Sequence, residues 1–184
     1  MLRRQDAALL DASVLIPMPL CDTLLRSAEA GLYTPYWSAD ILVEIERNLQ
    51  PWIGEEQARR RIVAMQVAFP QAGVIGYDHL IAAMTNHPKD RHVLAAAVIS
   101  DANVIVTANI RDFPPRALGT HGIVAQLPDT FLIELLQNHS ERVVDMIRRQ
   151  AAELRNPPVT MAELLNDLAR DAPGFVRRVT PMLV

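Results

Sequence analysis

Four carboxylic acids lie at points where the chain is expected to turn from one structural element to the next: Asp11, Glu44, Asp90 and Asp112. Carboxylates that crowd together repel one another, and a divalent cation is the usual way in which such a cluster is neutralised. Oxygen ligands without cysteine suit Mg²⁺ or Mn²⁺, which keep several waters and can hold a phosphate oxygen at the same time. The residue types therefore predict a divalent-metal site that can bind a phosphate group.

The segment 90–113 places two of these acids around a helix and the strand that follows it. Pro88 suits the first helical position, so Asp90 falls in the first turn. The buried stripe of this helix is expected to comprise Val93, Leu94, Ala97 and Val98. A strand at 104–107 then leads to Asp112. Open α/β folds can bring such a helix start and such a strand end to one edge of a parallel sheet, where they keep their sites.

Short apolar runs bounded by turn residues predict five buried strands, at residues 7–10, 32–36, 72–76, 104–107 and 122–125. Helical spacing of apolar residues predicts helices at about 20–31, from a capping Ser38 onward, and at about 55–69. Strands that alternate with helices indicate an α/β fold with a parallel sheet. Asp11 then stands at the end of the first strand.

Helical periodicity does not show whether Glu44 or Glu46 joins the other acids. Ile41, Leu42, Ile45 and Leu49 line one face of the helix that Ser38 opens. Glu44 and Glu46 lie on opposite edges of that face, and the spacing does not choose between them.

The last third of the sequence changes to helix alone. Helices are expected at 132–136 and 140–155, followed by a break at Pro157-Pro158 and a helix that Thr160 opens with Glu163 in capping-box register. We therefore expect an α/β domain over residues 1–131 and a helical extension over 132–184. The extension either packs on the first domain or contacts a partner.

The 184 residues fit one domain with a short appendage, and a hydrophobic content of 50% allows a sizeable core. No apolar run approaches a membrane span and no signal segment is evident, so we expect a cytoplasmic protein with no membrane contact. Cys21 is the single cysteine and is expected to be a small core residue. The net charge of −3 does not indicate a partner, and the absence of Gly-Lys-Ser/Thr excludes a Walker loop.

The motifs around the acids are Leu-Leu-Asp11-Ala-Ser13, Glu44 within Ile-Leu-Val-Glu-Ile, Asp90 opening an alanine-rich helix, and Val-Thr107-Ala-Asn109-Ile-Arg-Asp112-Phe. Together they resemble the PIN domain, and most closely the VapC-like toxin ribonucleases of prokaryotic toxin–antitoxin pairs. The resemblance covers roughly residues 9–131, and the helical tail resembles that of one PIN subgroup. The Thr-x-Asn-x-x-Asp-Phe segment after a buried strand is its most specific part.

The resemblance implies a three-layer α/β fold with a central five-stranded parallel sheet and a metal-dependent endoribonuclease. It implies that Asp11, Asp90 and Asp112 hold the main Mg²⁺ or Mn²⁺ ion, directly or through water. It also implies that Glu44, rather than Glu46, completes the site or holds a second ion. A metal can lower the pKa of its bound water from far above the physiological range to about 7, which creates hydroxide for attack on a phosphodiester.

Neighbouring residues would support this site. By the resemblance, Thr107 or Ser13 would orient water or a carboxylate, and Asn109 would fix the loop that carries Asp112. Arg91 and Arg111 stand beside proposed metal ligands and are candidates for substrate contact. The expected partners are an RNA substrate, a small cognate antitoxin and a second copy of the chain.

Each of these residues also has a structural explanation. Asp11, Asp90 or Asp112 could cap a helix or be stabilised by the dipole at its N-terminus. Glu44 could lie on the solvent-exposed edge of its helix. Their joint occurrence favours the metal site. The arginines 59–61 and 148–149 are candidate phosphate contacts or solvated faces. For Trp37 and Trp52, packing is favoured over stacking on a base. The five histidines lack the i, i+4 spacing of a helical zinc site, so surface or capping roles are expected.

Two other functions compete with a ribonuclease. A non-catalytic PIN-like module could bind RNA or a protein without cutting, although the presence of all four acids argues against a degenerate site. A haloacid-dehalogenase-like phosphohydrolase also places an acid at the end of its first strand. That class requires a second acid where Ser13 stands and a lysine late in the chain, whereas Lys89 is the sole lysine.

Overall fold

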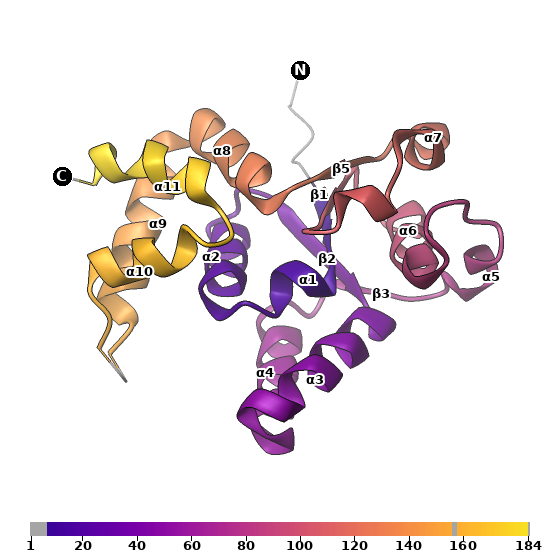
Figure 1. The fold of residues 1–184 in the computed structure, drawn as a ribbon, viewed down its shortest axis with the longest axis horizontal. Coiled ribbons are helices and arrows are strands. Elements are labelled where there is room, and N and C mark those ends of the chain that lie inside the picture. The colour runs from indigo at the N-terminus through magenta and orange to yellow at the C-terminus, as the bar shows by residue number, and fades with distance from the viewer. Residues whose placement is uncertain (1–6, 156–157, 184) are drawn as a thin grey trace. The chain divides into compact units, whose positions relative to one another are not determined.

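The computed structural model describes residues 7–155 and 158–183, which form two compact units. The first unit contains residues 7–16 and 33–126, and the second contains 17–32, 127–155 and 158–183 (Figure 1). An early helical segment therefore belongs with the C-terminal helices. The expected division into an α/β domain up to residue 131 and a helical extension after it stays a prediction. Pro157 of the expected proline break lies outside the described residues.

The first unit is built on a five-stranded parallel sheet, as the sequence predicts. The strands lie in the order β3-β2-β1-β4-β5. Their bounds are β1 Ala7–Leu10, β2 Thr34–Ser38, β3 Gly73–Val74, β4 Val104–Val106 and β5 Val124–Gln126. β1 and β4 are buried along their whole length, which is why they read as uninterrupted apolar runs. β2 and β5 begin two residues later than the apolar runs indicated.

The helices of the first unit are α1 Ala12–Leu15, α3 Ala39–Ile53, α4 Glu55–Ala68, α5 Asp78–Ile81, α6 Arg91–Ile99 and α7 Pro115–Leu118. Short 3₁₀ turns cover Pro88–Asp90, Ile110–Asp112 and Gly119–His121. The helix α6 packs against β1, β2 and β4, with a buried face that includes three consecutive alanines, Ala95 to Ala97. Small side chains let this helix approach the sheet closely. Val98, expected in the buried stripe, is half-buried.

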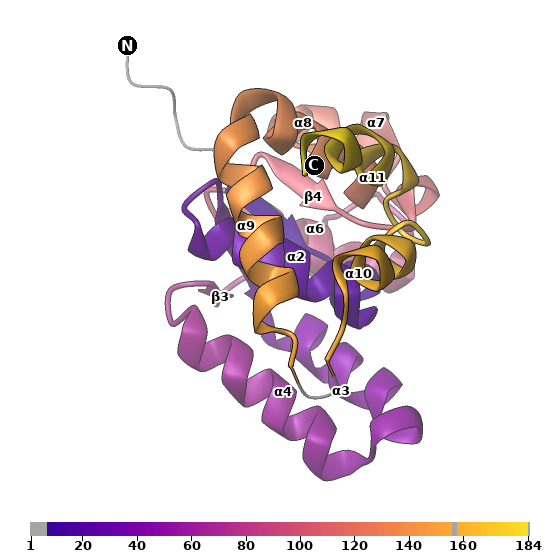
Figure 2. The ribbon, with the colours of Figure 1, turned by 90° about the vertical axis from the view of Figure 1, so that its left-hand side faces the viewer.

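The helices α3 and α4 pack side by side as a hairpin (Figures 1 and 2). Ser38 caps α3 as predicted, since its hydroxyl accepts the backbone N–H of Ile41 at 3.2 Å. The turn between the helices is Gly54, whose φ of 83° favours glycine. Trp37 is buried and meets Phe69 edge to face, so the packing prediction holds for it. Trp52 is 85% exposed, and the packing prediction is wrong there.

The second unit consists of helices α2 Met18–Glu29, α8 Pro128–Asn138, α9 Ser140–Glu153, α10 Met161–Leu168 and α11 Pro173–Val179, followed by a 3₁₀ turn Thr180–Met182. The helix α9 contacts α2, α8 and α10 (Figure 2). The predicted capping box of α10 is present, with Thr160 and Glu163 exchanging hydrogen bonds. Cys21 is buried, as expected.

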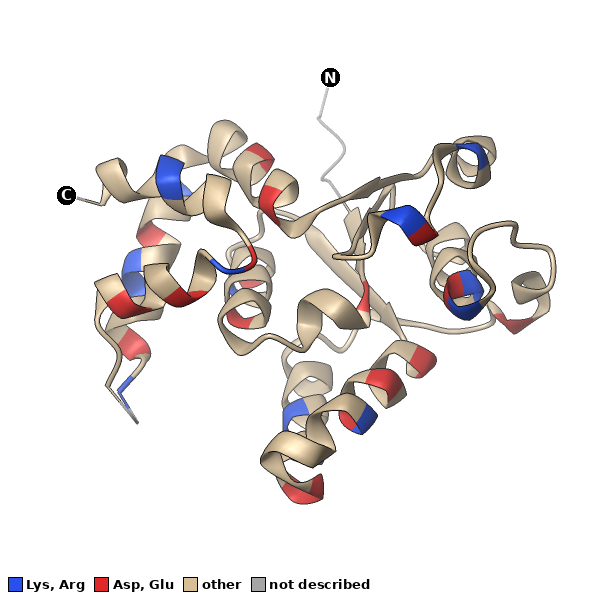
Figure 3. Ribbon diagram, in the orientation of Figure 1, with Lys and Arg blue, Asp and Glu red and all other residues tan. Residues whose placement is uncertain are grey.

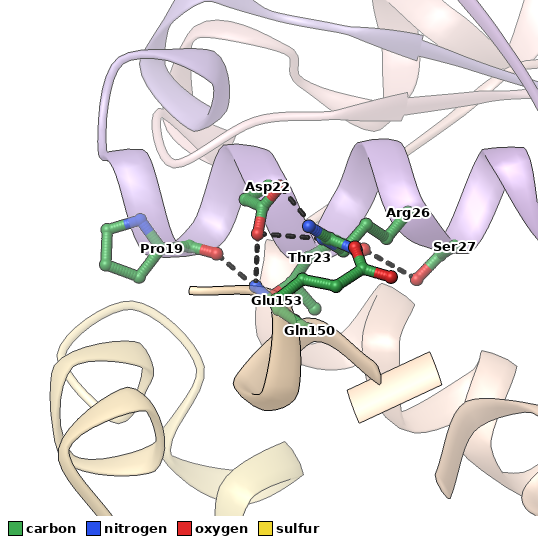
Figure 4. Close-up of polar contacts among 7 residues, drawn as sticks. All are labelled: Pro19, Asp22, Thr23, Arg26, Ser27, Gln150 and Glu153. Carbon is green, nitrogen blue, oxygen red and sulfur yellow. Dashed lines mark hydrogen bonds and ion pairs between the residues drawn. The ribbon is translucent and has the colours of Figure 1, made fainter. Parts of the chain in front are cut away.

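Polar side chains, some of them fully buried, join α2 to α9 (Figure 4). Gln150 is fully buried, accepts the Thr23 hydroxyl proton at 3.1 Å and donates to Asp22 at 2.9 Å. Arg26 donates to both Asp22 oxygens and to Glu153. These bonds fix the pairing of α2 with α9 through directional contacts as well as apolar packing. Within residues 7–155 and 158–183, no helix is both long and apolar enough to cross a membrane.

Candidate metal centre

The candidate site lies where the connections of the sheet change direction. β1 and β4 are neighbours, with Leu10 opposite Val106, yet the chain leaves β1 toward β2 and leaves β4 toward β5. The backbone N–H of Asp11 donates to Val106 at 3.1 Å and extends the pairing by one residue. Ligand sites of open α/β sheets lie outside the carboxyl ends of the strands at this kind of switch point.

Asp11 is buried and held by two hydroxyl groups. Ser13 donates to Asp11 Oδ2 at 2.6 Å, and Thr107 donates to the same oxygen at 2.8 Å. Hydrogen bonds to an ionised oxygen are short and strong, so these two donors fix the orientation of the carboxylate. The structure thus brings three of the expected site residues into direct contact.

The same hydroxyl groups organise the loop after β4. The Ala108 N–H donates to Ser13 Oγ at 3.0 Å, and the Asn109 N–H donates to Thr107 Oγ1 at 3.0 Å. The backbone carbonyl of Asn109 then accepts the Asp112 N–H at 2.9 Å. Asn109 therefore holds the Asp112 loop through its backbone, in a 3₁₀ turn that leaves Asp112 half-buried.

Asp90 is 4% exposed, and its Oδ2 has no hydrogen-bond partner among the described residues. Its backbone is fixed on both sides, since its N–H donates to the His87 carbonyl at 2.9 Å and its carbonyl accepts from Asn86 at 2.9 Å. A buried carboxylate oxygen without a donor is unfavourable. Such an atom is the expected mark of a ligand that binds there.

Burial raises the pKa of Asp90 above its ordinary value, and the charges of Asp11, Asp112 and Glu44 raise it further, while Lys89 acts in the opposite direction. The three other predicted acids are thus near enough to Asp90 to repel its negative charge. A divalent cation at this place would remove both the burial penalty and the repulsion.

His87 joins the acids at this site. One ligand atom each from His87, Asp90 and Asp112 lie within 4.8 Å of one another, and His87 Nδ1 is 3.6 Å from Asp90 Oδ2. His87 is exposed at the N-cap position, as expected, but the sequence did not predict that its imidazole lies beside two of the acids. The signal that could have found His87 is its position three residues before Asp90, in a turn that Pro88 begins.

Glu44 and Glu46 are both half-buried on α3, along which acidic positions recur (Figure 3). Of the two, Glu44 is the residue whose negative charge raises the pKa of Asp90. Asp40, one turn earlier, accepts a hydrogen bond from the buried Tyr77 hydroxyl at 2.8 Å. Glu44 thus lies on the acidic edge of α3.

Comparison with known proteins assigns the family. The PIN-domain family model matches residues 7–111, a range that includes Asp11, Glu44 and Asp90 and ends one residue before Asp112. The chain belongs to the PIN-domain family. Over 167 residues it is 38% identical to a Mycobacterium tuberculosis (strain ATCC 25618 / H37Rv) protein named "Putative ribonuclease VapC50", a match that covers 89% of this chain and 91% of that protein.

The helical tail has its own counterpart. A family model described as the VapC50 C-terminal domain matches residues 128–181. No solved structure matches the chain significantly. The PIN assignment confirms the family predicted from the motifs, and it sets aside the phosphohydrolase alternative, whose second acid is replaced here by Ser13, a hydrogen-bond donor to Asp11.

The arginines beside the candidate site and those of α4 lie in different environments. Arg111 is exposed and Arg91 is half-buried, with its Nε unbonded among the described residues. Arg59 and Arg60 form exposed ion pairs along α4. Arg61 donates to the carbonyl oxygens of Leu15 and Ile16, so it closes the C-terminal end of α1 rather than pointing freely to solvent.

The donor set of this PIN site fits a divalent cation. It combines carboxylates, a buried Asp90 oxygen to which no residue of 7–155 or 158–183 donates, and a nearby imidazole. Carboxylate oxygens are the ligands that Mg²⁺ and Mn²⁺ prefer, while an imidazole is compatible with several transition metals.

Proposed function

We propose that this PIN-family chain is a divalent-metal-dependent endoribonuclease and the toxin of a toxin–antitoxin pair. The observation that carries the proposal is the buried Asp90 Oδ2, which has no hydrogen-bond donor among the described residues and faces the charges of Asp11, Asp112 and Glu44. The sequence similarity to a protein named as a ribonuclease supports RNA as the substrate.

In this proposal Asp11, Asp90, Asp112 and Glu44 hold Mg²⁺ or Mn²⁺. When bound, the cation supplies Lewis acidity, which makes water a nucleophile near neutral pH and offsets charge on the phosphate. Ser13 and Thr107 keep the Asp11 carboxylate in one orientation, because both hydroxyl groups donate to its Oδ2. No side chain of the protein has to attack the phosphodiester.

The substrate and protein partners follow from the same assignment. Arg91 and Arg111 lie next to the acids that hold the metal, and we propose that they contact RNA phosphates. A small antitoxin that blocks the site and a homodimer are proposed on the grounds of family alone. Action on cellular RNA would place the protein in the cytoplasm.

The proposal is tested by incubating purified protein with end-labelled single-stranded RNA in Mn²⁺, in EDTA, and in EDTA followed by excess Mn²⁺. We expect cleavage in Mn²⁺, loss in EDTA and recovery after Mn²⁺ returns. A DNA strand of the same sequence should remain intact. Asp90→Asn protein purified in the same way controls for contaminating nucleases, because Asn keeps the side-chain size without the charge.

A thermal shift separates an enzyme from a binding module. A metal that binds the folded state raises its melting temperature by mass action, so Mn²⁺ should stabilise the wild type but not Asp90→Asn. RNA that is bound but never cut, together with no thermal shift in Mn²⁺, would contradict the proposal and favour a non-catalytic PIN-like module.

A further inference from the structure

We propose that His87 is a nitrogen ligand of the divalent cation at this site and that it shifts the preference of the protein from Mg²⁺ toward Mn²⁺. The inference rests on the proposed metal-dependent function and specifies its ligand set. It concerns a residue outside the four acids.

The distances suit a shared ion. His87 Nδ1 lies 3.6 Å from Asp90 Oδ2, and one ligand atom from each of His87, Asp90 and Asp112 lie within 4.8 Å of one another. Ligands at right angles around an ion at about 2.1 Å stand roughly 3.0 Å apart, and opposite ligands stand roughly 4.2 Å apart. The three atoms are therefore close to the separations of an octahedral site, and small side-chain rotations would complete the approach.

The backbone holds His87 between the two acids. Its N–H donates to the Asp112 carbonyl at 3.1 Å, and its own carbonyl accepts the Asp90 N–H at 2.9 Å. Pro88 further restricts the backbone of His87, which adopts φ −53° and ψ 131°. The backbone of His87 thus links the loop of Asp112 to the turn of Asp90. These hydrogen bonds fix the backbone from which the imidazole extends, relative to the backbone of both acids.

The side chains of Asp90 and His87 differ in their exposure to solvent. The Asp90 side chain is 6% exposed and its Oδ2 has no hydrogen-bond donor among the described residues, whereas the His87 side chain is 52% exposed. A buried carboxylate oxygen therefore lies beside an exposed imidazole. Solvent can reach this imidazole, and so can a hydrated ion. Mg²⁺ strongly prefers oxygen ligands, whereas an imidazole nitrogen is better tolerated by transition metals, which gives the expected preference.

A plain ion pair is the competing explanation. A protonated His87 could neutralise Asp90 without touching a metal, and its removal would then leave the coordination of the ion unchanged. The two roles differ in whether a nitrogen is bonded to the metal. Spectroscopy of bound Mn²⁺ can distinguish them.

The experiment uses the full chain loaded with Mn²⁺ alone, in wild type, His87→Ala and His121→Ala. His121 is an exposed histidine in the 3₁₀ turn before β5 and serves as the matched control. Pulsed electron paramagnetic resonance should detect nitrogen coupling to Mn²⁺ in the wild type and in His121→Ala, and no coupling in His87→Ala. Calorimetry should give a loss of Mn²⁺ affinity of about tenfold or more in His87→Ala and a smaller loss for Mg²⁺.

The outcomes separate this inference from the proposed function. Bound Mn²⁺ without nitrogen coupling in the wild type, or coupling that persists in His87→Ala, would overturn the ligand assignment and leave the metal-dependent nuclease standing. A wild type that binds no Mn²⁺ would contradict both. The backbone hydrogen bonds of His87 do not involve its side chain, so circular dichroism should confirm that His87→Ala keeps the fold.

Discussion

Asp90 is buried where its negative charge is unfavourable, and the nearby acids make that charge more unfavourable still. Burial and the charges of Asp11, Asp112 and Glu44 raise its pKa, and Lys89 opposes the shift. In the metal-free protein this carboxylate is a source of instability that the fold tolerates. Sites that bind charged ligands commonly retain such strain, because the ligand relieves it.

This instability has a definite pH dependence. Because the pKa of Asp90 is higher in the folded protein than in the unfolded chain, the folded state binds the proton more tightly. The stability that this bound proton gives the folded state is fully present below the pKa of the unfolded chain, about 4. It is lost as the pH rises through the pKa of Asp90 in the folded protein. Asn cannot ionise, so metal-free Asp90→Asn should be more stable than the wild type at pH 7, with the difference shrinking toward pH 4.

Thermal denaturation in EDTA across this pH range measures the effect. Each kcal/mol of added stability should raise the melting temperature by about 2–4 °C for a chain of this size. Asp101→Asn, at the turn before β4, controls for loss of a carboxylate in general. A melting temperature for Asp90→Asn that equals or falls below the wild type at pH 7 would contradict the account.

At the residue scale, sequence reasoning found the acids because their types and positions limit the chemistry. It did not find His87, whose approach to Asp90 and Asp112 depends on a turn and a backbone hydrogen bond between distant loops. Helical periodicity also left Glu44 and Glu46 equivalent, because a helical wheel gives directions around an axis and not distances to another element, and only the resemblance to PIN domains favoured Glu44. The charge interaction of Glu44 with Asp90 is a tertiary property.

Among the elements, α1 illustrates what local patterns omit. It spans four residues directly after Asp11 and was not expected, because so short a helix has little stability of its own. Arg61 of α4 donates to the carbonyl oxygens of Leu15 and Ile16 at its C-terminal end. The strands β1 and β4 were predictable because buried apolar runs determine them, whereas α1 depends on a contact from a residue more than forty positions later.

The role of Arg61 can be separated from that of its neighbours. Arg61→Ala should lower the free energy of unfolding by about 1–3 kcal/mol, because carbonyl groups at the end of α1 lose a charged donor. Arg59→Ala, which removes an exposed pair with Glu55, should cost less than about 0.5 kcal/mol. Urea unfolding of the two variants measures the difference, and equal losses would show that Arg61 is an ordinary surface residue.

At the scale of the whole molecule, the sequence predicted the α/β sheet and the helical tail but not how the helices are grouped. The helix α2 lies early in the chain and belongs to the same compact unit as the C-terminal helices. Its partner Gln150 is more than a hundred residues away, and it joins α2 by accepting a hydrogen bond from Thr23 and donating one to Asp22. Periodicity locates helices, whereas such pairing depends on contacts that periodicity does not encode.

The central claim is that acids at the carboxyl end of the sheet form a metal site that cleaves RNA. It is tested most directly by comparing Asp112→Asn with Asp101→Asn, two like substitutions at opposite ends of β4. In Mn²⁺, Asp112→Asn should cleave labelled RNA more slowly than the wild type by about 100-fold or more, while Asp101→Asn should keep the wild-type rate. Cleavage by Asp112→Asn at the wild-type rate would contradict the account.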